Sequence, residues 1–302
     1  MNRIEIESFF KGLQDRITKA LEKCDGKASF EEDNWTRAEG GGGRSRVIQN
    51  GNVFAKGGVN FSAVWGPAPE KITKALQVNG NEFYATGVSI VIHPQSPMVP
   101  IIHMNVRYFE MNDGTWWFGG GIDLTPHYIN SEDAVYFHQN LKEVCDRYHS
   151  SYYPQFKEWA DNYFFIPHRN ETRGIGGIFF DRLSEDREKG ISKEDRFSFV
   201  KDVGNLFAPL YIEIVNRNKE KPFSEAEKKW QSLRRSRYVE FNLVYDKGTK
   251  FGLDTNGRTE SILMSMPPSA NWEYNYSAPE GSREAETTSL LKKGINWANI
   301  NQ

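Results

Sequence analysis

The sequence predicts an α+β fold in which helices pack on a largely antiparallel sheet. Its β-like runs follow one another in hairpin-like groups, and its helical segments lie at the start, middle and end of the chain. Asn-Asp-Gly at 112–114 separates two aromatic runs, which is a strong hairpin signal. No linker divides the 302 residues, so we expect a single domain over residues 1–302.

The helices are predicted from apolar residues that recur three and four positions apart. The first covers about residues 3–24, and residues 131–163 read as helical. Two further helices are expected over about 192–218 and 223–236, and a last one around 281–294.

The strands are predicted from β-branched and aromatic runs bounded by turn residues. They occupy parts of 52–66, 81–94 and 99–124, with Gly57-Gly58 as a turn or bulge. Residues 237–268 are expected to form three short strands with glycine turns. Four glycines at 40–43 should interrupt regular structure and allow a close backbone approach; the alternative is a flexible linker.

The composition argues against several classes of protein. Lys and Arg number 38 against 40 Asp and Glu, a net charge of -2, which is unlike a nucleic-acid-binding surface. No run approaches the roughly 18–20 apolar residues of a membrane span, and the N-terminus does not resemble a signal peptide. Cys24 and Cys145 form no recognisable disulfide framework, so we expect a soluble protein of a reducing compartment, the cytoplasm.

Three predicted strands combine an apolar face with an unusual polar face. Residues two apart share a face, and an ordinary solvated face carries mainly Lys, Glu and Thr. These faces instead carry side chains that orient ligands by hydrogen bonds, which favours a ligand-binding surface over a merely wet sheet. The polar sets are Ser89, Val91 and His93; His103, Asn105 and Arg107; and Glu240, Asn242, Val244 and Asp246.

Other residues leave two interpretations open. Gly119–Gly121 leave space beside Asp123, which is either a site residue or a cap at a bulged strand end. Four histidines, His93, His103, His138 and His168, could converge on a metal, but no pair has a compact ligand spacing. His138 lies on an apolar helical stripe, which is typical of a core histidine. The GxGxxG-after-strand, P-loop and GxSxG motifs are absent.

Five long segments resemble one known family, the oxygen-dependent coproporphyrinogen III oxidases of haem biosynthesis. The segments are "GVSIVIHP" at 87–94, "IIHMNVRYFE" at 101–110, "WWFGGGIDLTP" at 116–126, "HRNETRGIGGIFFD" at 168–181 and the whole of 237–268. The resemblance extends from "GGGGRSRV" to "WEYNY" near the end of the chain.

This resemblance implies a fold, an activity and partners. The fold would be a large, flat, mostly antiparallel sheet sandwiched between helices, in a homodimer that associates through about residues 238–273. Two propionates of coproporphyrinogen III would be oxidatively decarboxylated to vinyl groups, giving protoporphyrinogen IX and CO2. Molecular oxygen would be the oxidant, with no flavin, haem or nicotinamide and with a divalent metal such as Mn as an open question.

The resemblance also implies roles for particular residues. Ser89, Asn105, Val106 and Arg107, with Asn256, Gly257 and Arg258, would bind substrate. His93, His103, His138 and His168 would be metal ligands, with His103 also the proton donor, and Asp123 and Asp246 would act on the pyrrole. Where the family commonly has Asp-Arg-Gly-Thr, this chain has Asp246-Lys247-Gly248-Thr249, so a bidentate grip on a carboxylate is lost there.

The expected pocket needs cations at its rim and flat surface beneath the rings. Arg44, Arg46, Arg107, Arg173, Lys247 and Arg258 are the available cations. We expect Asp123 to hold the ring, because the adjacent glycines give access. A metal-dependent oxygenase and a non-catalytic tetrapyrrole-binding protein are the alternative functions.

Overall fold

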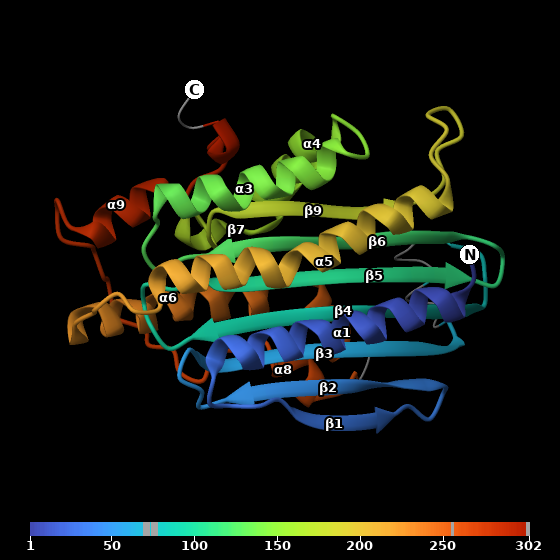
Figure 1. Ribbon diagram of the computed structural model, residues 1–302, viewed down its shortest axis with the longest axis horizontal. Coiled ribbons are helices and arrows are strands. Elements are labelled where there is room, and N and C mark those ends of the chain that lie inside the picture. Colours follow the sequence, from blue (N-terminus) through green and yellow to red (C-terminus); the bar gives the residue numbers. More distant parts are fainter. Residues whose placement is uncertain (69–72, 74–77, 255–256, 300–302) are drawn as a thin grey trace.

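A seven-stranded antiparallel sheet forms the centre of the computed structural model, which describes residues 1–68, 73, 78–254 and 257–299. Its strand order is β1-β2-β3-β4-β5-β6-β9, so most neighbours in the sheet are also neighbours along the chain (Figure 1). The strands are β1 Glu31–Thr36, β2 Gly41–Gln49, β3 Phe54–Pro67, β4 Glu82–Pro94, β5 Ile101–Met111, β6 Trp116–Thr125 and β9 Gly176–Leu183. Two short strands, β7 Phe165–Ile166 and β8 Glu171–Thr172, pair separately.

Helices lie on both faces of this sheet, which confirms the predicted α+β sandwich. The blue, green and gold helices α1, α3, α4 and α5 cover the face that Figure 1 presents, and α6 to α8 lie on the other. Their bounds are α1 Arg3–Asp25, α3 Ser131–Asp146, α4 Tyr152–Tyr163, α5 Lys193–Asn218, α6 Glu225–Val244, α7 Lys247–Asp254, α8 Thr259–Leu263 and α9 Arg283–Leu290.

The main core lies between the sheet and α1, α3, α4 and α5. Strand residues such as Ile90, Met104 and Ile122 alternate onto this face and are fully buried there with Phe10 and Phe207. Burying a side chain of this size stabilises a fold by roughly 1.5–3 kcal/mol relative to leaving it exposed. Because the apolar residues of each strand must enter this core, the residues that alternate with them point to the opposite face of the sheet.

Several helix ends are specified by local capping. Asn2, Ser192 and Ser224 each accept a hydrogen bond from the backbone N–H three residues on, and each is answered by an acidic residue that completes a capping box. Such an N-cap contributes about 1 kcal/mol. The helices predicted over 3–24 and 192–218 are confirmed with these boundaries, apart from one residue at each of two ends.

The prediction of three strands over 237–268 is wrong. Helix α6 continues to Val244, and α7 and α8 occupy most of the remainder. Arg234, Tyr238 and Phe241 are buried at helical spacing, so packing of this stripe on the sheet overrides the β-branched and aromatic composition. The predicted common face of Glu240, Asn242, Val244 and Asp246 does not exist as a strand face.

Other boundaries also differ from expectation. The glycines at 41–43 begin β2 instead of interrupting it, and Gly57-Gly58 lie inside β3. The expected close approach is present, since a Cβ on Gly43 would lie 2.3 Å from the Trp35 ring. The helical region 131–163 is divided into α3 and α4, and the last helix is shorter than predicted. None of the helices in the described part of the chain has the length and apolar character needed to cross a bilayer.

Candidate active site

The polar face of the sheet brings the predicted strand residues into aligned cross-strand rows. In the first row Ser89 lies opposite Asn105, and Asn105 lies opposite Gly121. Gly121 in turn pairs with Phe179, and Ser89 with Asn60 on β3. The side chains of Ser89, Asn105 and Phe179 are partly exposed, so this row forms an accessible strip across the sheet.

Two parallel rows flank that strip. On one side His103 of β5 pairs with Asp123 of β6. On the other side Arg107 pairs with Gly119, and Gly87 lies beyond it on β4. His103, Asn105 and Arg107 therefore share one face, as predicted from their spacing.

Glycines make the middle of this face flat. A Cβ on Gly119 would lie 2.5 Å from Asp181 Oδ1 and 2.9 Å from Arg107 Nε. A Cβ on Gly121 would lie 2.8 Å from the Ile178 carbonyl oxygen. Larger residues would displace the neighbouring groups, so these glycines preserve a low surface beside Asn105 on which a planar ring system can lie.

A buried carboxylate holds the His103 imidazole. Asp123 is 1% exposed, and its Oδ1 lies 2.7 Å from His103 Nδ1. Arg173, itself 2% exposed, donates to both Asp123 oxygens at 2.9 and 2.8 Å. Burial alone would raise the pKa of Asp123, but the Arg173 charge and the His103 hydrogen bond hold it below its usual value. The ionised carboxylate accepts, so Nδ1 carries the proton and Nε2 is left for other partners.

Helix α6 and the end of α4 cover this ion pair. Asn242 accepts a hydrogen bond from Arg173 at 2.8 Å. The guanidinium carbon lies 4.4–4.7 Å from the ring centroids of Phe164, Tyr238 and Phe241. Arg173 is thus enclosed and does not serve as one of the predicted rim cations. Asp123, whose two oxygens already have partners, faces His103 and Arg173 and not an open cavity.

Arg107 lies on β5, four residues after His103, and is partly exposed. Its side chain is 35% exposed, and its guanidinium donates to Asn105 Oδ1 at 2.7 Å. A second nitrogen lies 2.9 Å from Asp181 Oδ1 of β9. The side chain of Val106 points the other way into the main core, where it is fully buried.

Asp246 lies beside the strip, at the start of α7. It accepts hydrogen bonds from the Tyr163 hydroxyl at 2.8 Å and the Thr249 backbone N–H at 2.7 Å. Tyr163 stacks on Phe179 with ring centroids 4.3 Å apart. The Lys247 side chain is exposed. Asp246 is therefore linked to the strip through two aromatic rings.

Helix α8 borders the strip on the β2–β3 side. Ser261 and Ser45 hydroxyls lie 2.9 Å apart, and Met264 sulfur lies 2.8 Å from where a Gly58 Cβ would be. Arg258 donates to Ser261 and pairs with Asp33 of β1. Gly257 precedes this helix, and Asn256 lies outside the described residues. Arg44 and Arg46 contact Asp15 on α1, on the opposite face, so they do not line the strip.

The four predicted metal ligands are not brought together. His138 is buried in the opposite layer, bonded to the Tyr153 hydroxyl and the Ile175 carbonyl, which occupies both ring nitrogens. His168 binds Glu240 and Tyr245, and His93 binds the Ser265 carbonyl. Within the described ranges, no three His, Cys, Asp or Glu side chains are grouped as metal ligands. This donor set does not fit a four-histidine metal centre, whereas the prediction of a core position for His138 is confirmed.

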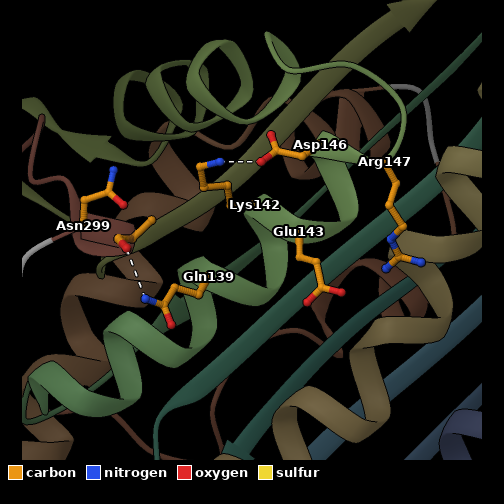
Figure 2. Close-up of a pocket in the computed structure, with 7 residues that line it drawn as sticks. Gln139, Lys142, Glu143, Asp146, Arg147 and Asn299 are labelled. Carbon is orange, nitrogen blue, oxygen red and sulfur yellow. Dashed lines mark hydrogen bonds and ion pairs between the residues drawn. The ribbon is translucent and has the colours of Figure 1, made fainter. Parts of the chain in front are cut away.

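A separate hollow of about 530 Å³ lies on the outside of α3 and the C-terminal segment (Figure 2). Lys142 and Asp146 form an ion pair there, and Gln139 donates to the Ala298 carbonyl. The hollow is open and lies in the helical layer that covers the apolar face. It shares no residue with the polar strip, and Arg147 at its edge pairs with Asp202 of α5.

Sequence reasoning missed three residues of the site, Tyr163, Phe179 and Asp181. Phe179 and Asp181 alternate on β9 as Asn105 and Arg107 do on β5, so strand spacing alone would have placed them on one face. The pairing of His103 with Asp123 was also readable, because each lies ten residues from Asp113 at the centre of the hairpin turn. The place of Tyr163 depends on how α4 packs and has no local signal.

The chain is similar to known proteins over almost its whole length. A family model described as coproporphyrinogen III oxidase matches residues 5–297. A curated protein of Prochlorococcus marinus, described as an oxygen-dependent coproporphyrinogen-III oxidase, is 47% identical over 318 aligned residues. The alignment covers 98% of this chain and 92% of the relative.

Proposed function

This chain belongs to the coproporphyrinogen III oxidase family, and we propose that it oxidises coproporphyrinogen III with O2 on the polar strip of its sheet. The observation that carries this assignment of the site is the arrangement of His103, Asn105 and Arg107 in successive rows of one strand, beside the glycines of β6. A flat floor with a proton donor and a guanidinium matches a tetrapyrrole that carries carboxylates.

The reaction requires a proton as well as O2. In the simplest balance, one propionate, O2 and a proton give one vinyl group, CO2 and hydrogen peroxide. The β-carbon loses one hydrogen, the carboxylate carbon leaves as CO2, and two electrons pass to oxygen. The family's second decarboxylation repeats the first at another propionate.

We assign the proton donor as His103 and its positioning residue as Asp123. The Nδ1–H bond to a buried, ionised carboxylate fixes the orientation and the tautomer of the ring. The 1% exposure of Asp123 supports positioning over the ring-binding contact expected from sequence. Asp246 is the better placed carboxylate for a pyrrole N–H, because it is partly exposed and linked by Tyr163 to the strip.

Arg107 is the proposed carboxylate anchor. Its side chain is a partly exposed cation in the row beside the strip, and its hydrogen bond to Asn105 orients it. Ser89 and Asn105 supply further hydrogen-bonding groups to the substrate, and Gly257 and Arg258 border it from α8. Val106 contributes through core packing that holds the strand.

The test is CO2 release from purified enzyme, with and without O2. We expect His103→Gln and Arg107→Met to lose activity by about 100-fold or more. Losses of this size are typical when a general acid or a residue that orients the substrate is removed. Arg147→Met is the control, since Arg147 follows α3 in the opposite layer and pairs with Asp202. Wild-type rates for both site variants would refute the placement of the site.

For cofactors, we propose O2 as co-substrate without an organic cofactor and without a bound metal. The separate partners of the four histidines support the last point. Chelator-treated enzyme is expected to retain full aerobic activity. Loss of activity that is restored by Fe or Mn would favour the metal-dependent oxygenase, and substrate binding without CO2 release would favour a non-catalytic tetrapyrrole-binding protein.

We further propose a cytoplasmic homodimer that associates through about residues 238–273. Five large apolar side chains of this region are 41–53% exposed: Leu243, Val244, Phe251, Leu253 and Trp272. An apolar group of this size is unusual on a monomer surface and is typical of a subunit interface. Sedimentation of the purified chain tests the dimer, and cell fractionation tests the location.

A further inference from the structure

A resident carboxylate occupies the anchor that the substrate needs. Asp181 Oδ1 lies 2.9 Å from a terminal nitrogen of Arg107, and the two side chains are 32% and 35% exposed. Any substrate carboxylate that binds this guanidinium must compete with Asp181. The arrangement differs from the Asp123–Arg173 pair, which is fully enclosed.

A β-bulge brings Asp181 to this position. The pairing of β6 with β9 shifts register between Phe118 and Gly120, so that Gly119 faces two residues of β9, Asp181 and Arg182. Arg182 has φ 52°, in the left-handed region, which turns the strand locally. Gly119 leaves the space in which the Asp181 and Arg107 side chains meet.

The contact is close but poorly aligned. Asp181 Oδ1 is a buried atom with no aligned hydrogen-bond donor among the described residues, even though Arg107 is near. Arg107 instead directs a hydrogen bond at Asn105. An ion pair without aligned N–H···O geometry is weaker than a bidentate arginine–carboxylate pair. A propionate that aligns better can therefore replace Asp181.

We propose that Asp181 is an exchangeable counter-ion of Arg107, displaced by a substrate propionate and re-paired after the carboxylate of that propionate leaves as CO2 and its other two carbons become the vinyl group. The proposal rests on the function assigned above and deepens it. When a propionate at this anchor becomes an uncharged vinyl group, it can no longer compete for the guanidinium. Asp181 then returns, and its return favours release or repositioning of the ring. Asp181 thereby acts as a specificity residue. It lowers the affinity of the enzyme for substrate, and it promotes turnover by favouring release or repositioning of the ring.

The experiment compares Asp181→Asn with the control Asp202→Asn. The two aspartates have similar side-chain exposure, 32% and 33%, and each pairs with one arginine, but Asp202 lies in the opposite layer. The dissociation constant of coproporphyrinogen III is measured without O2 by tryptophan quenching, and KM and kcat are measured with O2. Asp181→Asn should tighten binding about two- to fivefold, the usual range for a partly exposed ion pair, and lower KM without raising kcat.

Two further variants keep the outcomes distinct. In an Arg107→Met background, Asp181→Asn should leave the dissociation constant unchanged, because the competed cation is gone. Asp181→Ser serves if the asparagine variant does not fold. An unchanged or weakened affinity in Asp181→Asn would overturn the inference while leaving the site intact. Wild-type kinetics in Arg107→Met alone would instead refute the proposed function of that site.

Discussion

Asp123 Oδ1 lies 2.7 Å from His103 Nδ1, across one cross-strand pair of the sheet. The backbone pairing of β5 with β6 sets this distance, so it does not depend on a mobile loop. Arg173 closes the arrangement from behind by binding both carboxylate oxygens. The Nδ1 atom of the imidazole is thus fixed, while the side chain stays partly exposed.

Replacing Asp123 with Asn should reduce kcat by about 100-fold or more, because an amide does not enforce the tautomer and orientation of the His103 ring. CO2 release under saturating substrate measures the effect. The change also leaves Arg173 buried without a charge partner, which costs roughly 3–5 kcal/mol of stability. Activity is therefore measured at a temperature at which circular dichroism shows the variant to be folded.

A His103→Gln variant provides the comparison for that prediction. If Asp123 acts through His103, adding Asp123→Asn to His103→Gln should cause little further loss of kcat. Full additivity of the two losses would mean that Asp123 acts on the substrate by itself. Near-normal turnover in Asp123→Asn would remove it from the mechanism altogether.

Acid should destabilise the fold through buried histidines before the carboxylates titrate. Burial lowers the pKa of His93 and of His138 to about 3, and lowers that of His127 well below its usual value. A histidine with a folded-state pKa below its unfolded value of about 6.5 takes up its proton only on unfolding. The unfolded state then binds more protons, so stability is full above pH 6.5 and falls as the pH drops towards 3.

The predicted slope is about 1.4 kcal/mol per pH unit for each such histidine between pH 6 and 5, a window above the usual carboxyl range. Urea unfolding at several pH values measures it. His138→Gln should reduce the slope of unfolding free energy against pH by about 1.4 kcal/mol per pH unit, the contribution of one proton. This reduction is expected whatever the effect of the substitution on absolute stability. An equal slope in wild type and variant would show that His138 titrates normally.

The sequence was sufficient to predict the strands that carry the strip. It was insufficient to predict the side chains and helices that cover that face of the sheet. Alternation in 87–110 correctly placed Ser89, His103, Asn105 and Arg107 on one face, because the opposite residues had to enter the core. It could not show that Arg173, fifty residues from Asp123, would occupy that carboxylate. Such a contact depends on tertiary packing, which leaves no local period in the chain.

The same limit explains the error over 237–268. Its aromatic and β-branched residues fit a strand, and its 3.6-residue periodicity is visible only when Arg234, Tyr238 and Phe241 are aligned. The four-histidine metal set had no support from ligand spacing and was assigned by family resemblance, and the structure gives those rings separate partners. The residue type of these four histidines predicted that they would make polar contacts, but it did not predict which atoms they would contact.

Replacing Gly119 with Ala should impair substrate binding more than stability. Its Cβ would lie 2.5 Å from Asp181 Oδ1 and 2.9 Å from Arg107 Nε, so the charged side chains must move. We expect KM to rise by about tenfold, because the anchor is displaced from its aligned position, a cost on the order of 1.4 kcal/mol. Gly12→Ala is the control: Gly12 is partly exposed on α1, in the opposite layer, so the change should leave KM unchanged and add roughly 0.5–1 kcal/mol of stability. Equal KM values in both variants would show that the anchor tolerates displacement.

The apolar side chains of α6 and α7 should decide the oligomeric state. Phe251 is 49% exposed within the region proposed as the interface, and Phe223 is 43% exposed in the segment before α6. Lysine at a buried subunit interface leaves an unpaired charge, which typically costs several kcal/mol of association free energy, whereas lysine on a free surface costs little. Phe251→Lys should therefore weaken the dimer by at least about 100-fold, and Phe223→Lys should not. Analytical ultracentrifugation over a dilution series measures both dissociation constants. If both variants sediment as the wild type does, the exposed residues of α7 lie outside the interface, and association must use another surface.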